Sequence, residues 1–321
     1  MSKESLKHRG SFVFLVAAVA VLALVAGVAR GAQTTSTERS IAVDGLTRTF
    51  LIYRPPNLPS GMHPPLVVVL HGYGSDATAV ESRYHWDEQA DARGFVVAYP
   101  NGTNHGWNSG NCCAEAQRDK IDDVKFLTNM VQAVEASDGI DSHRVYFTGM
   151  SNGAHMAYRM ACDAAIPIAA IGPVSGTLDT QCSEPQPTSV LAINGRDDLI
   201  VPFKGGKSAD PSTVPAPVQA WRVHLPAIET VMERWRAIDR CGPSRTTRLG
   251  AVTTEIAQCP KARTVESIAI DGAGHQWPGA VPYDQQTIEL FRQHGLPVDQ
   301  PSMALDATRT LWEFFAAKEA P

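Results

Sequence analysis

Short apolar runs alternate with stretches of helical periodicity along most of the chain. The runs at 64–72, 94–100 and 144–149 are almost continuously apolar over the length of a strand, which is typical of strands buried on both faces of a sheet. Residues 119–136 and 304–317 instead carry apolar side chains three and four positions apart, which predicts amphipathic helices. This alternation predicts an α/β protein with a mostly parallel central sheet flanked by helices on both faces.

The other segments complete this order. Two strand-like runs meet at Asp44–Gly45, a dipeptide that favours the tight turn of a hairpin. Residues 203–225 are rich in proline and glycine without a period, so we expect a loop there. No linker or repeat is visible in residues 40–321, which are predicted to form a single catalytic domain. The further elements expected are helices at 76–93, 152–162 and 227–238, strands at 166–176, 189–195 and 264–272, and a hairpin at 242–258.

The N-terminus has the pattern of an export signal. Lys7 and Arg9 precede a long apolar run, 11–29, and polar residues follow it. We interpret residues 1–31 as a secretory signal peptide and residues 32–39 as a short polar linker. The run is long enough that an uncleaved membrane anchor is the alternative. In both cases the rest of the chain is expected to be secreted or extracytoplasmic, with membrane contact only through this segment. The candidate cleavage neighbours are Ala29, Gly31 and Ala32.

Composition narrows the classes of partner. The 321 residues carry a formal net charge of −5, with no cluster of Lys and Arg on a candidate helix, which argues against a nucleic-acid partner. The six cysteines include no CxxC pair, so a zinc ribbon or a thioredoxin-like site is disfavoured. Disulfides are the expected state of these cysteines in an exported chain.

The main chemical signal is the sequence Gly149-Met150-Ser151-Asn152-Gly153, a G-x-S-x-G motif between a predicted strand and a predicted helix. A serine at such a sharp turn takes a strained backbone conformation, and a glycine two residues away on each side avoids a clash. The pentapeptide alone is a weak signal. Its place between strand and helix predicts that Ser151 is a catalytic nucleophile.

A serine hydroxyl needs a base to take its proton and a carboxylate to orient that base. His275 is the candidate base, because it lies in a glycine-rich loop after a predicted strand. Asp197 and Asp198 both follow the strand predicted at 189–195, and either residue could be the acid. The order Ser, Asp, His along the chain is that of the α/β-hydrolase fold.

An oxyanion hole is expected from the backbone N–H groups of Asn152 and Tyr73. Tyr73 lies in a turn that follows a central strand, and two glycines keep this turn open. We interpret His71, in the same turn, as a residue that stabilises the turn and not as a catalytic one.

Five motifs follow one another from about residue 40 to the C-terminus: PLVVVLHGYG, WNSGNCC…IDDVKFL, RVYFTGMSNGAHMAYRMAC, GRDDLIVPF and GHQWPG. In this order they resemble the secreted esterase family that includes polyhydroxybutyrate depolymerases and feruloyl or acetylxylan esterases. The resemblance implies an α/β-hydrolase fold and a serine esterase that forms an acyl-enzyme and needs no metal or organic cofactor. It selects Asp198, since the family's acid lies four residues before the proline of VPF. Where the family commonly has His-Gly before the acid loop, this chain has Asn194-Gly195, a change away from the triad.

Trp107, Asn108 and Trp277 fall in loops at the active-site end and are expected to line the substrate pocket. Trp277 also matches the tryptophan that flanks the pocket in the family. The expected substrate is an ester, from a polyester oligomer or from an acyl group of the plant cell wall; acyl and alcohol specificity stay open. The alternative is a non-catalytic hydrolase-fold binding protein at the cell surface, although such proteins usually lose a triad member. A peptidase is a further alternative, and it is disfavoured because such enzymes commonly carry an extra propeller or cap domain, which we do not see in this sequence.

The expected topology also pairs the cysteines. Cys162 ends the helix that leads away from the nucleophile, and Cys182 precedes a strand that starts on that same side, so these two can form a disulfide. A second disulfide is expected for Cys241–Cys259, which bracket the predicted hairpin. The adjacent Cys112–Cys113 pair is left over in the active-site loop, as a disulfide or as two thiols, and export favours the disulfide.

Overall fold

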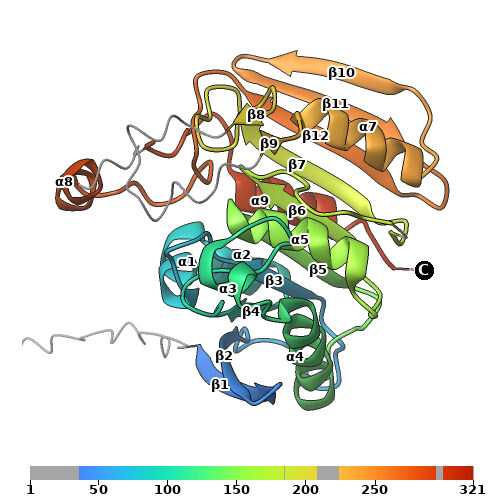
Figure 1. Cartoon of the computed structure of the whole chain (residues 1–321). Coiled ribbons are helices and arrows are strands. Elements are labelled where there is room, and N and C mark those ends of the chain that lie inside the picture. The colour runs from blue at the N-terminus through green and yellow to red at the C-terminus, as the bar shows by residue number, and fades with distance from the viewer. Residues whose placement is uncertain (1–35, 184, 208–223, 294–298, 321) are drawn as a thin grey trace, which may run out of the picture. The chain divides into compact units, whose positions relative to one another are not determined.

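A ten-stranded sheet forms the centre of the computed structural model, which describes residues 36–183, 185–207, 224–293 and 299–320 (Figure 1). The strands lie in the order β1-β2-β4-β3-β5-β6-β7-β12-β11-β10. All neighbours from β4 to β12 are parallel, and antiparallel strands extend the sheet at both edges. The bounds are β1 Thr37–Val43, β2 Leu46–Tyr53, β3 Leu66–Leu70, β4 Val96–Pro100, β5 Val145–Met150, β6 Ala170–Val174, β7 Ser189–Gly195, β10 Ser244–Leu249, β11 Val252–Gln258 and β12 Thr264–Ile270.

Helices cover both faces of this sheet (Figure 1). One hydrophobic core joins the sheet to α4, α5 and α7, and a second core joins its other face to α1, α2 and α9. The expected α/β architecture is confirmed. The helices are α1 Ala77–Tyr84, α2 Trp86–Arg93, α3 Ala114–Arg118, α4 Asp123–Asp138, α5 Asn152–Asp163, α7 Ile228–Ile238, α8 Gln285–Gln293 and α9 Ala307–Phe315.

Strand β3 shows why the central runs are apolar throughout. Leu66, Val68 and Leu70 belong to the core on the α5 side, whereas Val67 and Val69 belong to the core on the α9 side. Successive side chains of a strand point to opposite faces. A strand covered on both faces must therefore be apolar at every position, and all five side chains of β3 are buried.

The helix expected at 76–93 is two helices in the structure. His85 takes a left-handed φ of 58° between them, and α2 then starts with Trp86, whose side chain is fully buried. Helices α3 and α8 were not expected from the pattern. Within the loop expected at 203–225, the short strands β8 (Gly206–Lys207) and β9 (His224–Leu225) pair. Residues 208–223 lie outside the described residues.

The expected leader, residues 1–31, and residues 32–35 of the linker also lie outside the described residues. None of the helices described here has both the length and the apolar character of a membrane span. The division of the chain into leader, linker and one domain over 40–321 stays a prediction.

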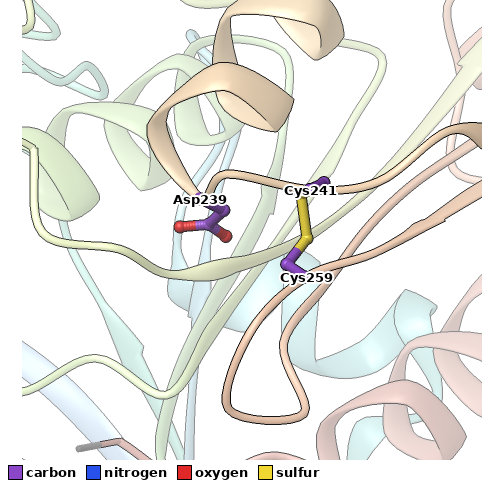
Figure 2. Close-up of side chains that lie close together, drawn as sticks. All are labelled: Asp239, Cys241 and Cys259. Atoms are coloured by element: carbon purple, nitrogen blue, oxygen red, sulfur yellow. A yellow bond between two sulfur atoms is a disulfide. The ribbon is translucent and has the colours of Figure 1, made fainter.

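Disulfides join the two cysteine pairs that the expected topology brings together and also the adjacent pair, for which disulfide and thiols were both open. Cys162–Cys182 connects the end of α5 to the segment before β7, with 5.2 Å between the two Cα atoms. Cys241–Cys259 closes the β10–β11 hairpin at its base, as Figure 2 shows. The third disulfide joins the neighbours Cys112 and Cys113.

A buried ion pair joins β2, the second strand from the edge of the sheet, to the first residue of α4. Arg48 on β2 donates to Asp123 on α4 at 2.7 Å, with 4% and 0% of the two side chains exposed. The other Asp123 oxygen accepts the backbone N–H of Asn108 at 2.7 Å, and the guanidinium lies 4.0 Å from the ring centre of Phe126. Burial raises the pKa of Asp123, and Arg48 opposes this rise.

Replacing Arg48 should destabilise the fold more than replacing an arginine of an exposed pair. Arg48→Met leaves the Asp123 carboxylate buried without its partner, and the expected loss is about 3–5 kcal/mol of unfolding free energy in urea titrations. Arg118→Met is the control, because Arg118 pairs with Asp119 where both side chains are exposed. Equal unfolding midpoints for the two variants would contradict this account.

Candidate active site

Ser151 lies at the junction between β5 and α5 with an unusual backbone conformation. Its φ is 57° and its ψ is −122°, a region that residues with a side chain rarely adopt. The N–H of Ser151 donates to Val174 O at the end of β6 at 3.0 Å, and its carbonyl accepts the His155 N–H of α5 at 3.0 Å. These contacts hold the strained turn between the sheet and the helix.

The two glycines of the motif are required by close contact. A Cβ atom on Gly153 would lie 2.3 Å from Leu70 O and 2.7 Å from His71 O. A Cβ atom on Gly149 would lie 2.6 Å from the same Leu70 oxygen. Real Cβ contacts are not this short, so β5 and α5 can approach β3 only where both positions lack a side chain.

His275 and Asp198 form a hydrogen-bonded pair at the ends of two neighbouring strands. Nδ1 of His275 lies 2.8 Å from Oδ2 of Asp198, and the side chains are 11% and 0% exposed. The other Asp198 oxygen accepts the N–H groups of Ile200 and Val201, each at 2.8 Å. Because the carboxylate accepts at Nδ1, the neutral imidazole keeps its proton there and Nε2 is its basic nitrogen.

A short chain of contacts links this pair to the Ser151 turn. Ser175 follows Val174, the residue that accepts the Ser151 N–H. The Ser175 hydroxyl donates to the carbonyl of Gln276 at 2.9 Å, and Gln276 is the neighbour of His275. Ser151, Asp198 and His275 follow β5, β7 and β12, so all three lie at the carboxyl ends of parallel strands, where open α/β sheets place their sites.

The surroundings of His275 act on its pKa in opposite directions. Burial lowers the pKa of His275, whereas the charge of Asp198, the hydrogen bond to Asp198 and the charge of Asp299 raise it, and the net pKa is raised. A raised pKa makes the imidazole a better acceptor for a proton from a neighbouring hydroxyl.

The turn after β3 lies beside Ser151. A Cβ atom on Gly72 would lie 3.5 Å from the Ser151 Cβ. His71 is buried, and its Nε2 accepts the Gly102 N–H at 2.9 Å while Nδ1 lies 2.8 Å from Gly72 O. Burial lowers the pKa of His71 to about 4, so the ring is neutral and holds the turn through both nitrogens. This arrangement agrees with a stabilising role for His71.

Comparison with known proteins places the chain in a family. Residues 48–198 match the model of the family described as esterase PHB depolymerase. NocK of Nocardia uniformis subsp. tsuyamanensis, a protein named as an esterase, is 31% identical over 271 residues, which cover 78% of this chain and 77% of NocK. The chain belongs to the PHB depolymerase esterase family.

A further relative and a solved structure are also similar to this chain. Feruloyl esterase B of Piromyces equi is 25% identical over 73% of this chain, which spans 42% of that protein. The solved structure of the acetyl xylan esterase from Aspergillus awamori matches with a TM-score of 0.53 at 17% identity, over 81% of this chain and 99% of the other. The α/β-hydrolase fold is thereby confirmed, and the protein is a carboxylic ester hydrolase.

In this esterase, α5 holds the loop that carries the tryptophan expected in the pocket. The Asn152 side chain accepts the Trp107 N–H at 2.7 Å and donates to Trp107 O at 3.0 Å. Two turns further along α5, Arg159 donates to the carbonyl of Asn108. The side chain of Asn108 donates to Ile121 O at 2.9 Å. The loop is thus fixed against α5, the helix that begins directly after Ser151.

Two of the expected pocket residues lie in the interior instead. Trp107 is fully buried, and its Nε1 donates to His71 O at 2.9 Å. Trp277 is 2% exposed, stacks on Tyr84 with 4.3 Å between ring centres, and donates to Thr308. Neither indole can offer a wall to a substrate in this structure. Each bulky ring fills the core next to a loop, a position that sequence alone does not distinguish from the mouth of a pocket.

A buried pair one helical turn from Ser151 was not predicted from the sequence. Nδ1 of His155 lies 3.3 Å from Oδ2 of Asp179, with 5% and 0% of the side chains exposed. Ser109 donates to the same Asp179 oxygen at 3.0 Å. A signal was present, since His155 follows Ser151 by four residues and therefore lies one helical turn away. Asp299, which accepts the His275 N–H at 2.6 Å, had no such signal.

One group of side chains in the described part of the chain brings together atoms of metal-binding type. These are Asp239, Cys241 and Cys259, shown in Figure 2. Both sulfur atoms are joined in a disulfide and are therefore not thiolates. Oδ1 of Asp239 accepts the Thr188 N–H at 3.1 Å and lies 3.5 Å from Arg263. Burial raises the pKa of Asp239 to about 6. We therefore interpret these three residues as a structural part of the base of the β10–β11 hairpin and not as a metal site.

Gly153→Ala should damage both the fold and the site. The added Cβ would meet two backbone oxygens, so α5 must shift, and the expected effects are a loss of about 1–3 kcal/mol of stability and a fall of about a hundredfold in the rate of ester hydrolysis. The measurements are urea unfolding and hydrolysis of nitrophenyl acetate. Gly242→Ala is the control, because the nearest atom to its Cβ would be 3.8 Å away. A Gly153 variant as active as this control would show that the helix does not need the close approach.

Proposed function

We propose that this esterase cleaves carboxylic esters through an acyl-enzyme, with Ser151 as nucleophile, His275 as general base and Asp198 as the acid that orients the histidine. The observation that carries the proposal is the 2.8 Å bond between His275 and Asp198 beside the strained turn of Ser151. This combination of nucleophile, base and orienting carboxylate recurs in serine hydrolases.

In the first half-reaction, the Ser151 hydroxyl attacks the ester carbonyl and passes its proton to Nε2 of His275. The imidazolium that forms is stabilised by the Asp198 carboxylate. The tetrahedral intermediate collapses, and the alcohol leaves with the proton that His275 returns. In the second half-reaction, water attacks the acyl carbon while His275 takes a proton from this water. The Ser151 oxygen then departs from the acyl carbon and receives that proton from His275, which releases the carboxylic acid.

The negative charge of the intermediate needs donors that are already in place. We assign this role to the backbone N–H groups of Asn152 and Tyr73. Asn152 is the first residue of α5, and the first N–H groups of a helix have no acceptor within the helix. Tyr73 lies in the turn that His71 fixes next to Ser151.

For the substrate, we propose a polyester oligomer or an acyl ester of the plant cell wall, met by an exported enzyme. This is supported by the family's description and by the printed names of the feruloyl and acetyl xylan esterases. Rates of the mature protein on short nitrophenyl esters, methyl ferulate, acetylated xylan and hydroxybutyrate oligomers would separate these possibilities. Binding without turnover on the whole panel would instead favour a non-catalytic binding protein.

Ser151→Ala should abolish ester hydrolysis while the fold persists. Removal of the nucleophile of a serine triad typically costs on the order of a million-fold in kcat. The measurement is kcat on the best ester of the panel, with circular dichroism and the unfolding midpoint as controls for the fold. Residual activity within tenfold of the parent would exclude Ser151 as the nucleophile.

Asp198→Asn and Asp197→Asn form a matched pair that tests the acid. Asp198→Asn should lower kcat roughly ten-thousand-fold, because the amide no longer holds the productive histidine tautomer. Asp197 is exposed in the same loop, and its substitution should have little effect. The reverse ranking of the two rates would show that Asp197 is the acid.

A further inference from the structure

A second carboxylate contacts the loop of the proposed catalytic histidine. Oδ2 of Asp299 accepts the backbone N–H of His275 at 2.6 Å. The contact extends to the preceding residue, because a Cβ atom on Gly274 would lie 2.1 Å from the same oxygen. Gly274 therefore leaves the space in which this carboxylate rests against the histidine loop.

The segment that carries Asp299 is fixed to that loop by other bonds. The Gln300 side chain accepts the Tyr283 N–H and donates to Tyr283 O, both at 3.1 Å. The Ser302 N–H donates to the side chain of Gln276 at 2.6 Å, and the Ser302 carbonyl accepts the Gly279 N–H at 3.0 Å. Bonds from Gln300 and Ser302 to residues that follow His275 thus hold the segment of Asp299 in place.

His275 consequently lies between two carboxylates from different parts of the fold. Asp198 approaches the ring from the loop after β7, and Asp299 approaches the backbone from the segment before α9. The charges of both raise the pKa of His275. Of the other charged groups on the β7 loop, Asp197 is exposed and Arg196 is paired with Asp271 at 2.9 Å.

We propose that Asp299 is a positioning residue of the active site: it holds the His275 loop through the backbone N–H, and its negative charge stabilises the imidazolium formed while Ser151 is acylated. This inference rests on the proposed function of Ser151 and His275. A neutral acceptor would hold the loop equally well, so the charge itself is the part of the proposal that needs a separate test.

Asp299→Asn removes the charge but keeps an oxygen that can accept the His275 N–H. Because the free enzyme acts with a neutral base, kcat/KM falls as the pH falls through the pKa of His275. Loss of the charge should lower this pKa, so the acid limb of the profile moves to lower pH. Activity at pH 5, as a fraction of the plateau, should rise about two- to fivefold, while the plateau itself falls by up to about tenfold.

Asp299→Ala removes both the charge and the acceptor. The histidine loop loses its anchor, and the plateau of kcat should fall about a hundredfold, well below that of Asp299→Asn. Asp197→Asn is the matched control, a carboxylate close in sequence to Asp198 whose loss should leave the acid limb in place. An acid limb at the same pH for Asp299→Asn and the parent would overturn the electrostatic role, and equal plateaus for the Ala and Asn variants would overturn the anchoring role.

A spectroscopic readout separates this inference from the proposed function. In protein labelled with 13C at histidine Cε1, the His275 signal is assigned by its loss in His275→Gln, and its titration gives the pKa without any substrate. Asp299→Asn should lower that pKa and Asp197→Asn should not. If the parent hydrolysed no ester, the proposed function would fail, yet the titration would still test the effect of Asp299 on His275; an unchanged titration in an active enzyme would overturn this inference alone.

Discussion

The site depends on one constraint, the close approach of α5 and β5 to the end of β3. At Gly153 and Gly149 the backbone lies so near to Leu70 O that added Cβ atoms would be 2.3 and 2.6 Å from it. No side chain fits at either position. The contact places the turn after β3 beside Ser151, and it sets the direction in which α5 leaves the sheet. The strained φ of Ser151 is the local consequence of joining a strand to a helix within this distance.

The same helix, α5, also holds the loop that contains Trp107 and Asn108. Asn152 and Arg159 are seven residues apart and therefore lie on one face of α5, and both bind backbone groups of the loop at Trp107 and Asn108. His155 lies between them and faces Asp179. The helix that begins directly after Ser151 thus also fixes this loop, so a shift of α5 would disturb both the Ser151 turn and the loop.

The sequence predicts those parts of the molecule that follow from local pattern. The apolar runs of β3, β4 and β5 and the turn of Ser151 are visible because burial on both faces and the clash at a sharp turn restrict residue types position by position. The break at His85 is not visible, since a left-handed residue between two helices leaves their apolar spacing almost intact. Trp107 and Trp277 were misplaced for a related reason: a tryptophan at the end of a strand has the same local pattern whether it faces the core or a cleft. Asp299 acts through a contact made across 24 residues, and no periodicity encodes such a contact.

His71 and His275 show how burial and nearby charge shift the pKa of a histidine in opposite directions. Both are removed from water, and burial lowers the pKa of each. For His71, no carboxylate is among its hydrogen-bonding partners within the described residues, its pKa falls to about 4, and the neutral ring serves as a fixed bridge between backbone groups. For His275, two carboxylates outweigh the burial and raise the pKa. The pKa of histidine, which is near neutral in water, is thereby shifted in opposite directions. The pKa of His71 is lowered, so its ring stays neutral, and the pKa of His275 is raised, so its ring is more basic. Two carboxylates, Asp198 and Asp299, contact His275, whereas the His71 ring is hydrogen-bonded to backbone groups of Gly72 and Gly102, and this difference separates the two histidines.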